Sequence, residues 1–195
     1  MAYNPIKHHR RSIRLKGYDY AQAGLYFITI CTQNRVCLFG DVINGEMILN
    51  QYGQIAYNEW LKTPQIRNNV ELGDFVIMPN HIHVIIRLLC RGKSHSPDIH
   101  ESHSPNIHEL HGGGVLNTPP NLPPNSPPQS PSQTIGGIVR GCKSTVTKQL
   151  GLLGFDGKLW QRNYYEHIIR DERSYLNISA YIINNPGNWH NDSLK

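Results

Sequence analysis

The stretch from residue 74 to residue 89 constrains the fold most, because its pattern is typical of a β-hairpin with one unusual face. Two apolar segments, DFVIM and HIHVIIRLL, flank Pro79-Asn80, a dipeptide that favours a tight turn. Side chains alternate across a strand, so His81 and His83 share one face, whereas the opposite face is entirely aliphatic. The sequence therefore predicts a hairpin whose second strand begins with two histidines on the same side.

The remainder of the chain alternates between strand and helix patterns. Strands are predicted at 24–34 (GLYFITICTQN), at 45–50 (GEMILN, a shorter strand) and at 158–171, and helices at 51–67, at 134–150 and from 171 to a stop at Pro186. The order strand, helix, hairpin, helix, strand, helix is that of a ferredoxin-like α+β sandwich with an extra C-terminal helix. We expect an antiparallel sheet with the two histidines on a central strand.

Two segments differ in composition from this pattern. Residues 1–20 are rich in lysine and arginine, which indicates either a solvated tail or a surface that contacts phosphate. Residues 91–133 contain an eight-residue repeat, SHSPDIHE and SHSPNIHE, followed by a tract of Gly, Pro, Ser and Asn, which has too little apolar surface to order itself. The prediction is one domain, 1–195, with a basic N-terminal segment at 1–20 and a flexible insertion at 91–133.

Composition also excludes several classes of protein. The four cysteines form no CxxC pair, so neither a zinc knuckle nor a disulfide framework is indicated, and we expect reduced thiols. The apolar runs are much shorter than the ~20 residues that span a bilayer, and no signal peptide precedes them. A cytoplasmic protein without a membrane partner is expected, and its net charge of +5 favours a polyanionic partner.

Two imidazoles at i and i+2 on one strand face lie about 6–7 Å apart at Cα, close enough to bind one divalent ion together. A third, oxygen-bearing ligand would complete a site that leaves positions open for a phosphate oxygen. In an arbitrary sequence, an exposed HxH on a strand is more often incidental, so the histidines alone do not decide the function.

Three motifs in order resemble the single-tyrosine transposases of the HUH nuclease superfamily, in particular the REP-associated tyrosine transposase branch. They are VIMPNHIHVII, LWQRNYYEHIIRDE and YIINNPGNW, and the segment RRSIRLKGYDYAQAGLYFITICTQNRVCLFG is also similar to that branch. The resemblance covers nearly everything outside 91–133. It implies an IS200-like transposase domain in which the terminal helix carries the reactive tyrosine.

The resemblance assigns roles to particular residues. His81 and His83 become the metal ligands, for Mg²⁺ or Mn²⁺, and Tyr181 on the last helix becomes the nucleophile, with Tyr165 as the alternative. Relatives commonly carry a glutamine four residues after the tyrosine as third ligand, and this chain has Asn185 there, one methylene shorter. Whether Asn185 reaches the metal is left open by the sequence.

The implied function is metal-dependent cleavage and rejoining of single-stranded DNA through a 5′-phosphotyrosine intermediate. The implied partner is single-stranded or hairpin DNA, with no small-molecule cofactor, and the relatives include both homodimers and monomers. Two alternatives stay open: a catalytically inactive nucleic-acid-binding protein of the same fold, and a replication initiator or relaxase, although the chain has no P-loop. DNA-binding candidates are Arg10, Arg11, Arg14, Arg87, Lys143 and Arg162, and Arg140, Lys148 and Arg170 belong to the same basic set.

Overall fold

A computed structural model describes residues 22–89 and 134–195. The basic segment at 1–20, with Arg10, Arg11 and Arg14, and the insertion predicted at 91–133 lie outside the described residues. The division of the chain into one domain with these two appendages therefore stays a prediction.

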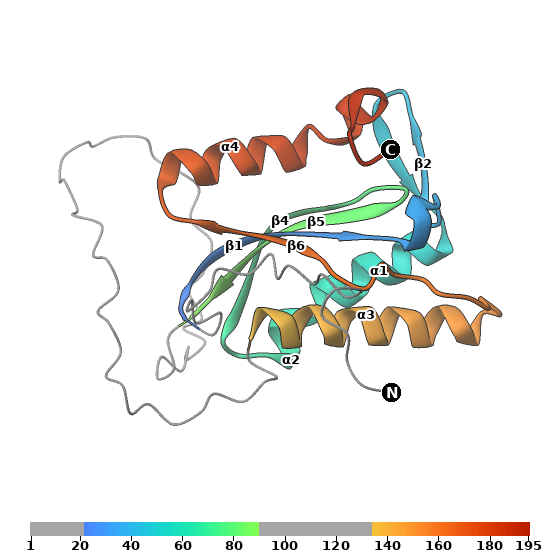
Figure 1. Cartoon of the computed structure of the whole chain (residues 1–195), viewed down its shortest axis with the longest axis horizontal. Helices are drawn as coiled ribbons and strands as arrows, with labels where there is room; N and C mark the ends of the chain where they lie inside the picture. Colours follow the sequence, from blue (N-terminus) through green and yellow to red (C-terminus); the bar gives the residue numbers. More distant parts are fainter. Residues whose placement is uncertain (1–21, 90–133) are drawn as a thin grey trace, which may run out of the picture.

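The described residues form an α+β sandwich around a four-stranded antiparallel sheet, as predicted (Figure 1). The strand order is β4-β5-β1-β6, which places the histidine strand β5 at a central position. A second sheet contains only β2 and β3. In chain order the elements are β1 (Gly24–Cys31), η1 (Gln33–Arg35), β2 (Gly40–Ile43), β3 (Glu46–Leu49), α1 (Gln51–Leu61), α2 (Thr63–Ile66), β4 (Val70–Ile77), β5 (His81–Leu88), α3 (Ile135–Leu152), β6 (Tyr165–Ile169), α4 (Glu172–Ile183) and η3 (Pro186–Asn191).

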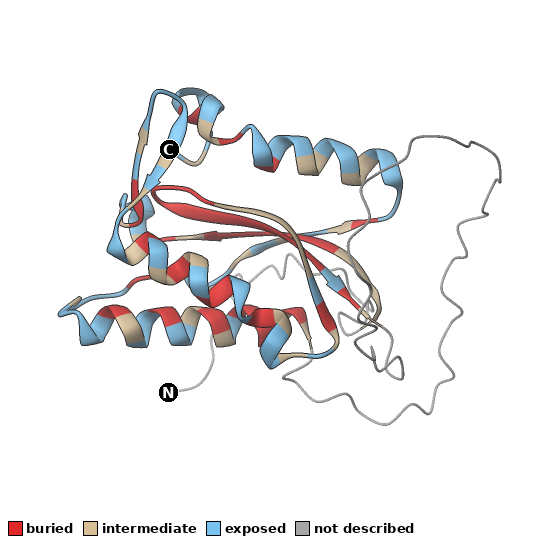
Figure 2. Ribbon diagram, turned by 180° about the vertical axis from the view of Figure 1, so that it is seen from behind, coloured by how far each residue is buried: buried red, intermediate tan, exposed pale blue. Residues whose placement is uncertain are grey.

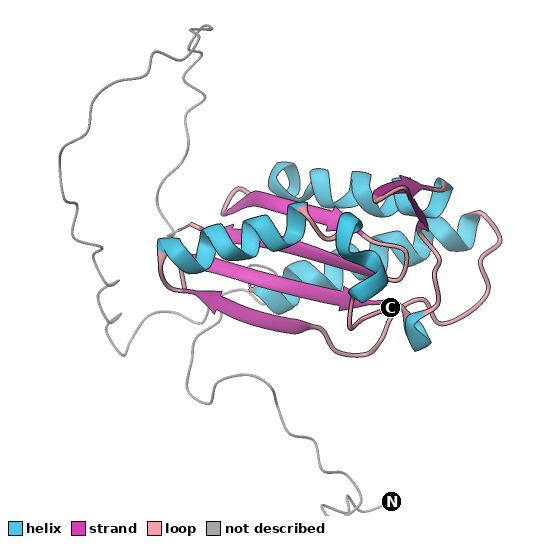
Figure 3. Ribbon diagram, turned by 90° about the horizontal axis from the view of Figure 1, so that it is seen from above, coloured by secondary structure: helices cyan, strands magenta, loops and turns pink. Residues whose placement is uncertain are grey.

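Helices cover both faces of the sheet, and this burial explains the sequence of β5. Helices α1 and α3 lie on one face, against the aliphatic side chains Ile82, Val84 and Ile86, and α4 lies on the other face (Figures 1 and 3). Seven of the eight residues of β5 are buried as a result (Figure 2). The face of β5 that carries the histidines is therefore the face that α4 covers.

Helix α4 is fixed on the sheet by apolar packing and by polar contacts, one of which lies at the opposite end of the sheet order from β6. Ile182 is buried in a small cluster with Phe27 and Ile85 of the sheet. Ser179 donates a hydrogen bond to the carboxylate of Asp74, which lies where the pairing register of β4 and β5 shifts. Such irregularities bend a strand and redirect its side chains, and here the irregular segment places an acceptor against α4.

Several predicted elements differ from those observed. The strand predicted at 24–34 ends at Cys31, before the 3₁₀ helix η1. The helix predicted at 51–67 is divided at Lys62, because a new short helix, α2, begins at Thr63 with Pro64 in its first turn. The strand predicted at 158–171 forms only as β6, since the chain before it is irregular. The strand predicted at 45–50 pairs with β2, which the prediction missed, although Asn44 and Gly45 both have positive φ and join the two strands as an Asn-Gly turn typically does.

Two further expectations concern the described residues only. Cys31, Cys37 and Cys142 are free thiols, as predicted. Within 22–89 and 134–195, none of the helices combines the length and hydropathy that crossing a bilayer requires.

Candidate metal and tyrosine site

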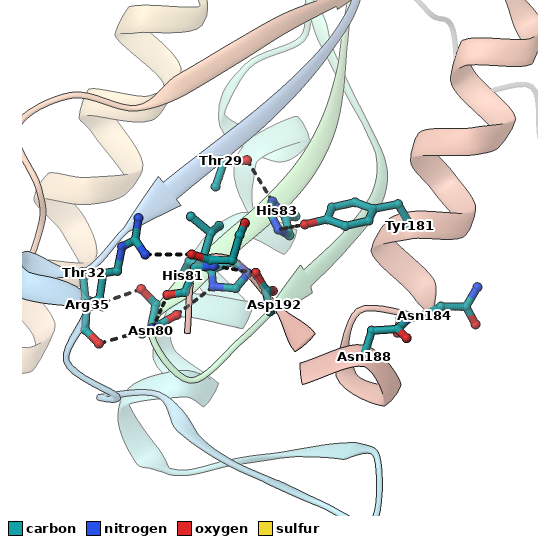
Figure 4. Close-up of polar contacts among 12 residues, drawn as sticks. Thr29, Thr32, Arg35, Asn80, His81, His83, Tyr181, Asn184, Asn188 and Asp192 are labelled. Carbon is teal, nitrogen blue, oxygen red and sulfur yellow. Dashed lines mark hydrogen bonds and ion pairs between the residues drawn. The ribbon is translucent and has the colours of Figure 1, made fainter. Parts of the chain in front are cut away.

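The turn that precedes β5 fixes the tautomer of the first histidine. The Asn80 amide nitrogen donates to the backbone carbonyls of Leu194 (2.8 Å) and Arg35 (3.3 Å), so its oxygen faces Nδ1 of His81 at 2.7 Å (Figure 4). An amide oxygen only accepts, so Nδ1 of His81 carries the proton. Nε2 of His81 is then an unprotonated donor atom, the form in which histidine binds metals.

His83 lies between a threonine and the candidate nucleophile. Its Nδ1 is 2.9 Å from Oγ1 of Thr29, and its Nε2 is 3.2 Å from the phenol oxygen of Tyr181 (Figure 4). In the tautomer that leaves Nε2 able to bind a cation, the phenol donates to Nε2 and the Nδ1 hydrogen points to the threonine hydroxyl. The ring of Phe27 contacts both the His83 and Tyr181 rings, with centroids 5.3 and 6.3 Å away. This aromatic packing keeps the phenol oxygen of Tyr181 next to Nε2 of His83.

The segment after α4 brings two more oxygen-bearing side chains to the histidines. Asn185 begins the turn into η3, where its side chain is 2% exposed, and Asp192 follows η3 with Oδ2 3.6 Å from Nε2 of His81. The ligand atoms of His81, His83 and Asp192 all lie within 4.8 Å of one another. These three residues form a cluster that could hold a metal ion. Sequence reasoning missed Asp192 altogether.

Three buried polar atoms at this cluster have no hydrogen-bond partner. Nε2 of His81, Oδ1 of Asn185 and Oδ2 of Asp192 are all buried without one, although Oδ1 of Asp192 accepts from the Leu194 amide. A buried carboxylate oxygen without a partner is costly, and a bound cation removes that cost. The donor set therefore fits a divalent cation.

Burial keeps all three reactive rings in their neutral forms. It lowers the pKa of His81 to about 4, against the opposing effects of the Asp192 carboxylate and the Asn185 amide, and it lowers the pKa of His83 to about 3. Burial and Asp192 raise the pKa of the Tyr181 phenol, while a hydrogen bond from Asn185 lowers it. At neutral pH the histidines are free to bind a cation, and the phenol needs one to lose its proton.

The other tyrosines considered are not in contact with the histidines. Tyr165 is 52% exposed at the edge of the sheet and its ring packs on Phe27. Tyr175 belongs to α4 and packs in the small apolar cluster, and Tyr164 packs against the core on the opposite face. Among the described tyrosines, only Tyr181 has its hydroxyl bonded to a histidine of the pair.

The DNA-binding candidates within the described residues lie in two places. Arg87 is at the far end of β5, where it forms an exposed ion pair with Glu71 at 3.6 Å. Lys143 on α3 donates to the backbone carbonyls of Gln161 and Asn163, and burial lowers its pKa to about 8. Arg162 lies between those two carbonyls, on the α3 side of the sheet rather than beside Tyr181.

Comparison with known proteins shows a close relative in sequence. The chain is 45% identical over 193 residues to an uncharacterized protein of Haemophilus influenzae, which covers 98% of this chain and 96% of that protein. The chain belongs to the family of that protein. No protein-family model matches the chain.

A solved structure shares the fold of this family member. It is a REP-associated tyrosine transposase bound to a REP hairpin, with a TM-score of 0.55 and 18% sequence identity, and the match covers 91% of this chain and 74% of that one. The family thus has a REP-transposase-like fold, as the resemblance in sequence implied. At this identity the likeness shows the fold, and the chemistry has to be argued from the side chains.

Proposed function

We propose that the protein is a metal-dependent endonuclease and strand transferase of single-stranded DNA, a transposase of the HUH type. The observation that carries this proposal is the position of the Tyr181 phenol oxygen, 3.2 Å from Nε2 of His83 and beside the His81, His83 and Asp192 cluster. A nucleophile adjacent to a cation site is the arrangement that phosphodiester transesterification needs.

Four side chains would hold the cation, Mg²⁺ or Mn²⁺. They are His81 and His83 from β5, Asn185 from the start of η3 and Asp192 after it. When bound, the cation supplies Lewis acidity that polarises a phosphate oxygen and favours the phenolate form of Tyr181. The sequence motif offered only the short side chain of Asn185 as an oxygen ligand. In the proposed set, Asp192 supplies a carboxylate in addition.

The residues of the chain have separate tasks in the reaction. Asn80 keeps Nε2 of His81 unprotonated, and the Thr29 hydroxyl orients the His83 ring through its contact with Nδ1. Tyr181 forms a bond from its oxygen to phosphorus while the bond from phosphorus to the 3′ oxygen breaks. The phenol proton passes to solvent, the 3′ oxygen takes up a proton from solvent and leaves as a 3′-OH, and the 5′ phosphate stays on Tyr181. One phosphodiester replaces another, so rejoining needs no external energy source.

The polarity of the adduct tests this function. Oligonucleotides labelled at either end are incubated with the protein and Mn²⁺ or Mg²⁺ and separated on a denaturing gel. We expect the 3′-labelled strand to migrate with the protein and the 5′-labelled strand to appear as a free shorter product ending in 3′-OH. Hairpin oligonucleotides belong in the panel because the solved neighbour is bound to a REP hairpin. Binding of DNA without any adduct would instead support an inactive binding protein.

The carboxylate of Asp192 should strengthen cation binding. We expect Asp192→Asn to weaken Mn²⁺ binding by roughly 10-fold or more, because even outer partners of a metal site contribute about 10–100-fold. The substitution keeps an oxygen for the Leu194 amide and removes only the charge. Titration calorimetry measures the affinity, with Asp41→Asn, an exposed acid on β2, as the control. An unchanged affinity would remove Asp192 from the ligand set.

A further inference from the structure

A basic pocket lies on the opposite side of the sheet from Tyr181. Its volume is about 230 Å³, and it is lined by Gly136, Val139, Arg140, Lys143, Arg162 and Tyr164, none of which is acidic. The side chains of Arg140 and Arg162 make no ion pair or hydrogen bond with another described residue. Two exposed guanidinium groups without acidic partners are suited to phosphate, which they bind through paired hydrogen bonds.

The pocket is held in shape by contacts between α3 and the segment before β6. The Lys143 ammonium donates to the carbonyls of Gln161 (2.8 Å) and Asn163 (3.0 Å), the residues on either side of Arg162. The Trp160 indole donates to the Lys143 carbonyl at 3.1 Å. Lys143 therefore positions the segment that carries Arg162 against the helix that carries Arg140.

The pocket and the tyrosine site are separated by a single edge strand. β6 ends the sheet order, and its edge away from β1 pairs with no other described strand. Tyr164 packs on the α3 side of the sheet and Tyr165 on the α4 side, where its ring contacts Phe27. The side chains of these consecutive residues thus point to opposite faces of the sheet, and only the edge strand lies between the two faces here.

Tyr165 lies in the same cross-strand row as His83. It pairs with Thr29 across β6 and β1, and Thr29 pairs with His83 across β1 and β5. Two strand spacings amount to about 10 Å, so the half-exposed Tyr165 ring lies between the sheet edge and the Tyr181 site. An exposed aromatic ring beside a cationic surface is typical of sites that bind single-stranded nucleic acid.

We propose that the pocket lined by Arg140 and Arg162 binds backbone phosphate of a DNA single strand, which then crosses the edge of β6 and passes Tyr165 to reach Tyr181. This inference rests on the proposed function for the identity of the strand. Among the DNA-binding candidates, Arg162 and Lys143 line this pocket. Arg87 does not, and it is paired with Glu71 at the other end of the sheet.

Salt-dependent binding tests the pocket without requiring cleavage. Fluorescence anisotropy of a labelled oligothymidylate is measured in EDTA at several salt concentrations. For Arg140→Ala/Arg162→Ala we expect weaker binding and a log-log salt slope smaller by about 1.4, because each phosphate contact on a single strand contributes about 0.7. The control Lys158→Ala/Arg173→Ala removes two exposed charges elsewhere and should leave the slope unchanged. In the same assay Tyr165→Ala should lose roughly 10-fold in affinity and Tyr165→Phe should not.

The outcomes distinguish this inference from the proposed function. An unchanged slope in the arginine double variant overturns the pocket, even if the wild-type protein forms an adduct. A reduced slope supports the pocket, even if no adduct forms. Pocket-dependent binding of RNA but not of DNA of the same sequence would also overturn the proposal. Both arginines are exposed, and circular dichroism checks that the variants are folded.

Discussion

Tyr181→Phe is expected to abolish the covalent protein–DNA adduct. The substitution removes only the phenol oxygen, which is the atom that lies 3.2 Å from Nε2 of His83. The ring should stay packed on Phe27, since that contact does not involve the hydroxyl. The other described hydroxyl bonded to the histidine pair belongs to Thr29, which is buried and contacts Nδ1 of His83 rather than Nε2, so it does not replace the nucleophile. The thermal midpoint should change little, and DNA binding in EDTA should be retained.

Tyr165→Phe is the matched control for this experiment. It removes the same atom from a tyrosine that also packs on Phe27 but makes no hydrogen bond or ring contact with either histidine, so the adduct should form at the wild-type level. The adduct is detected after denaturation as labelled DNA that migrates with the protein. Persistence of the adduct in Tyr181→Phe, with its loss in Tyr165→Phe, would transfer the nucleophile to the edge strand.

His81→Ala and His83→Ala are each expected to weaken Mn²⁺ binding by more than about 100-fold, since even outer-shell partners contribute about 10–100-fold. Both side chains are almost fully buried, and their rings supply the nitrogen donors of the cluster. Adduct formation should fall with occupancy and be partly restored at high Mn²⁺. Titration calorimetry and the gel assay measure the two effects.

His167→Ala controls for the loss of an imidazole. His167 is exposed on β6 and pairs with Phe27, outside the cluster. Because the buried histidines also contribute packing, the free energy of unfolding in EDTA is measured for each variant. Wild-type affinity for Mn²⁺ in folded His81→Ala or His83→Ala would rule out the proposed metal site.

The central strand could be predicted because its pattern is local. Alternation along β5 is determined by burial on both faces, and His81 and His83 follow the same alternation as Ile85. The helix at α3 was also predictable in spite of its glycines. Glycine suits position 141, because a β-carbon there would come within 2.8 Å of the Arg67 guanidinium, which donates to the Gly137 carbonyl. Gly141 thus makes room for the side chain of Arg67, the residue that follows α2.

Asp192 could not be predicted because nothing local distinguishes it. It follows a 3₁₀ helix in an irregular tail, and its approach to His81 depends on the turn at η3 and on the contacts of Asn80 and Arg35 with the last residues. The basic pocket has the same origin. Arg140 and Arg162 are far apart in sequence, and they meet only because Lys143 bonds to the carbonyls on either side of Arg162.

The proposed ligands divide evenly between two parts of the molecule: His81 and His83 belong to the rigid sheet, and Asn185 and Asp192 to the chain after α4. A cation bound by all four would cross-link the chain after α4 to the sheet. Metal occupancy would then set how often this segment detaches, and chelation would loosen it before the rest of the fold. The ion would in this way govern the mobility of the segment that directly follows the tyrosine helix.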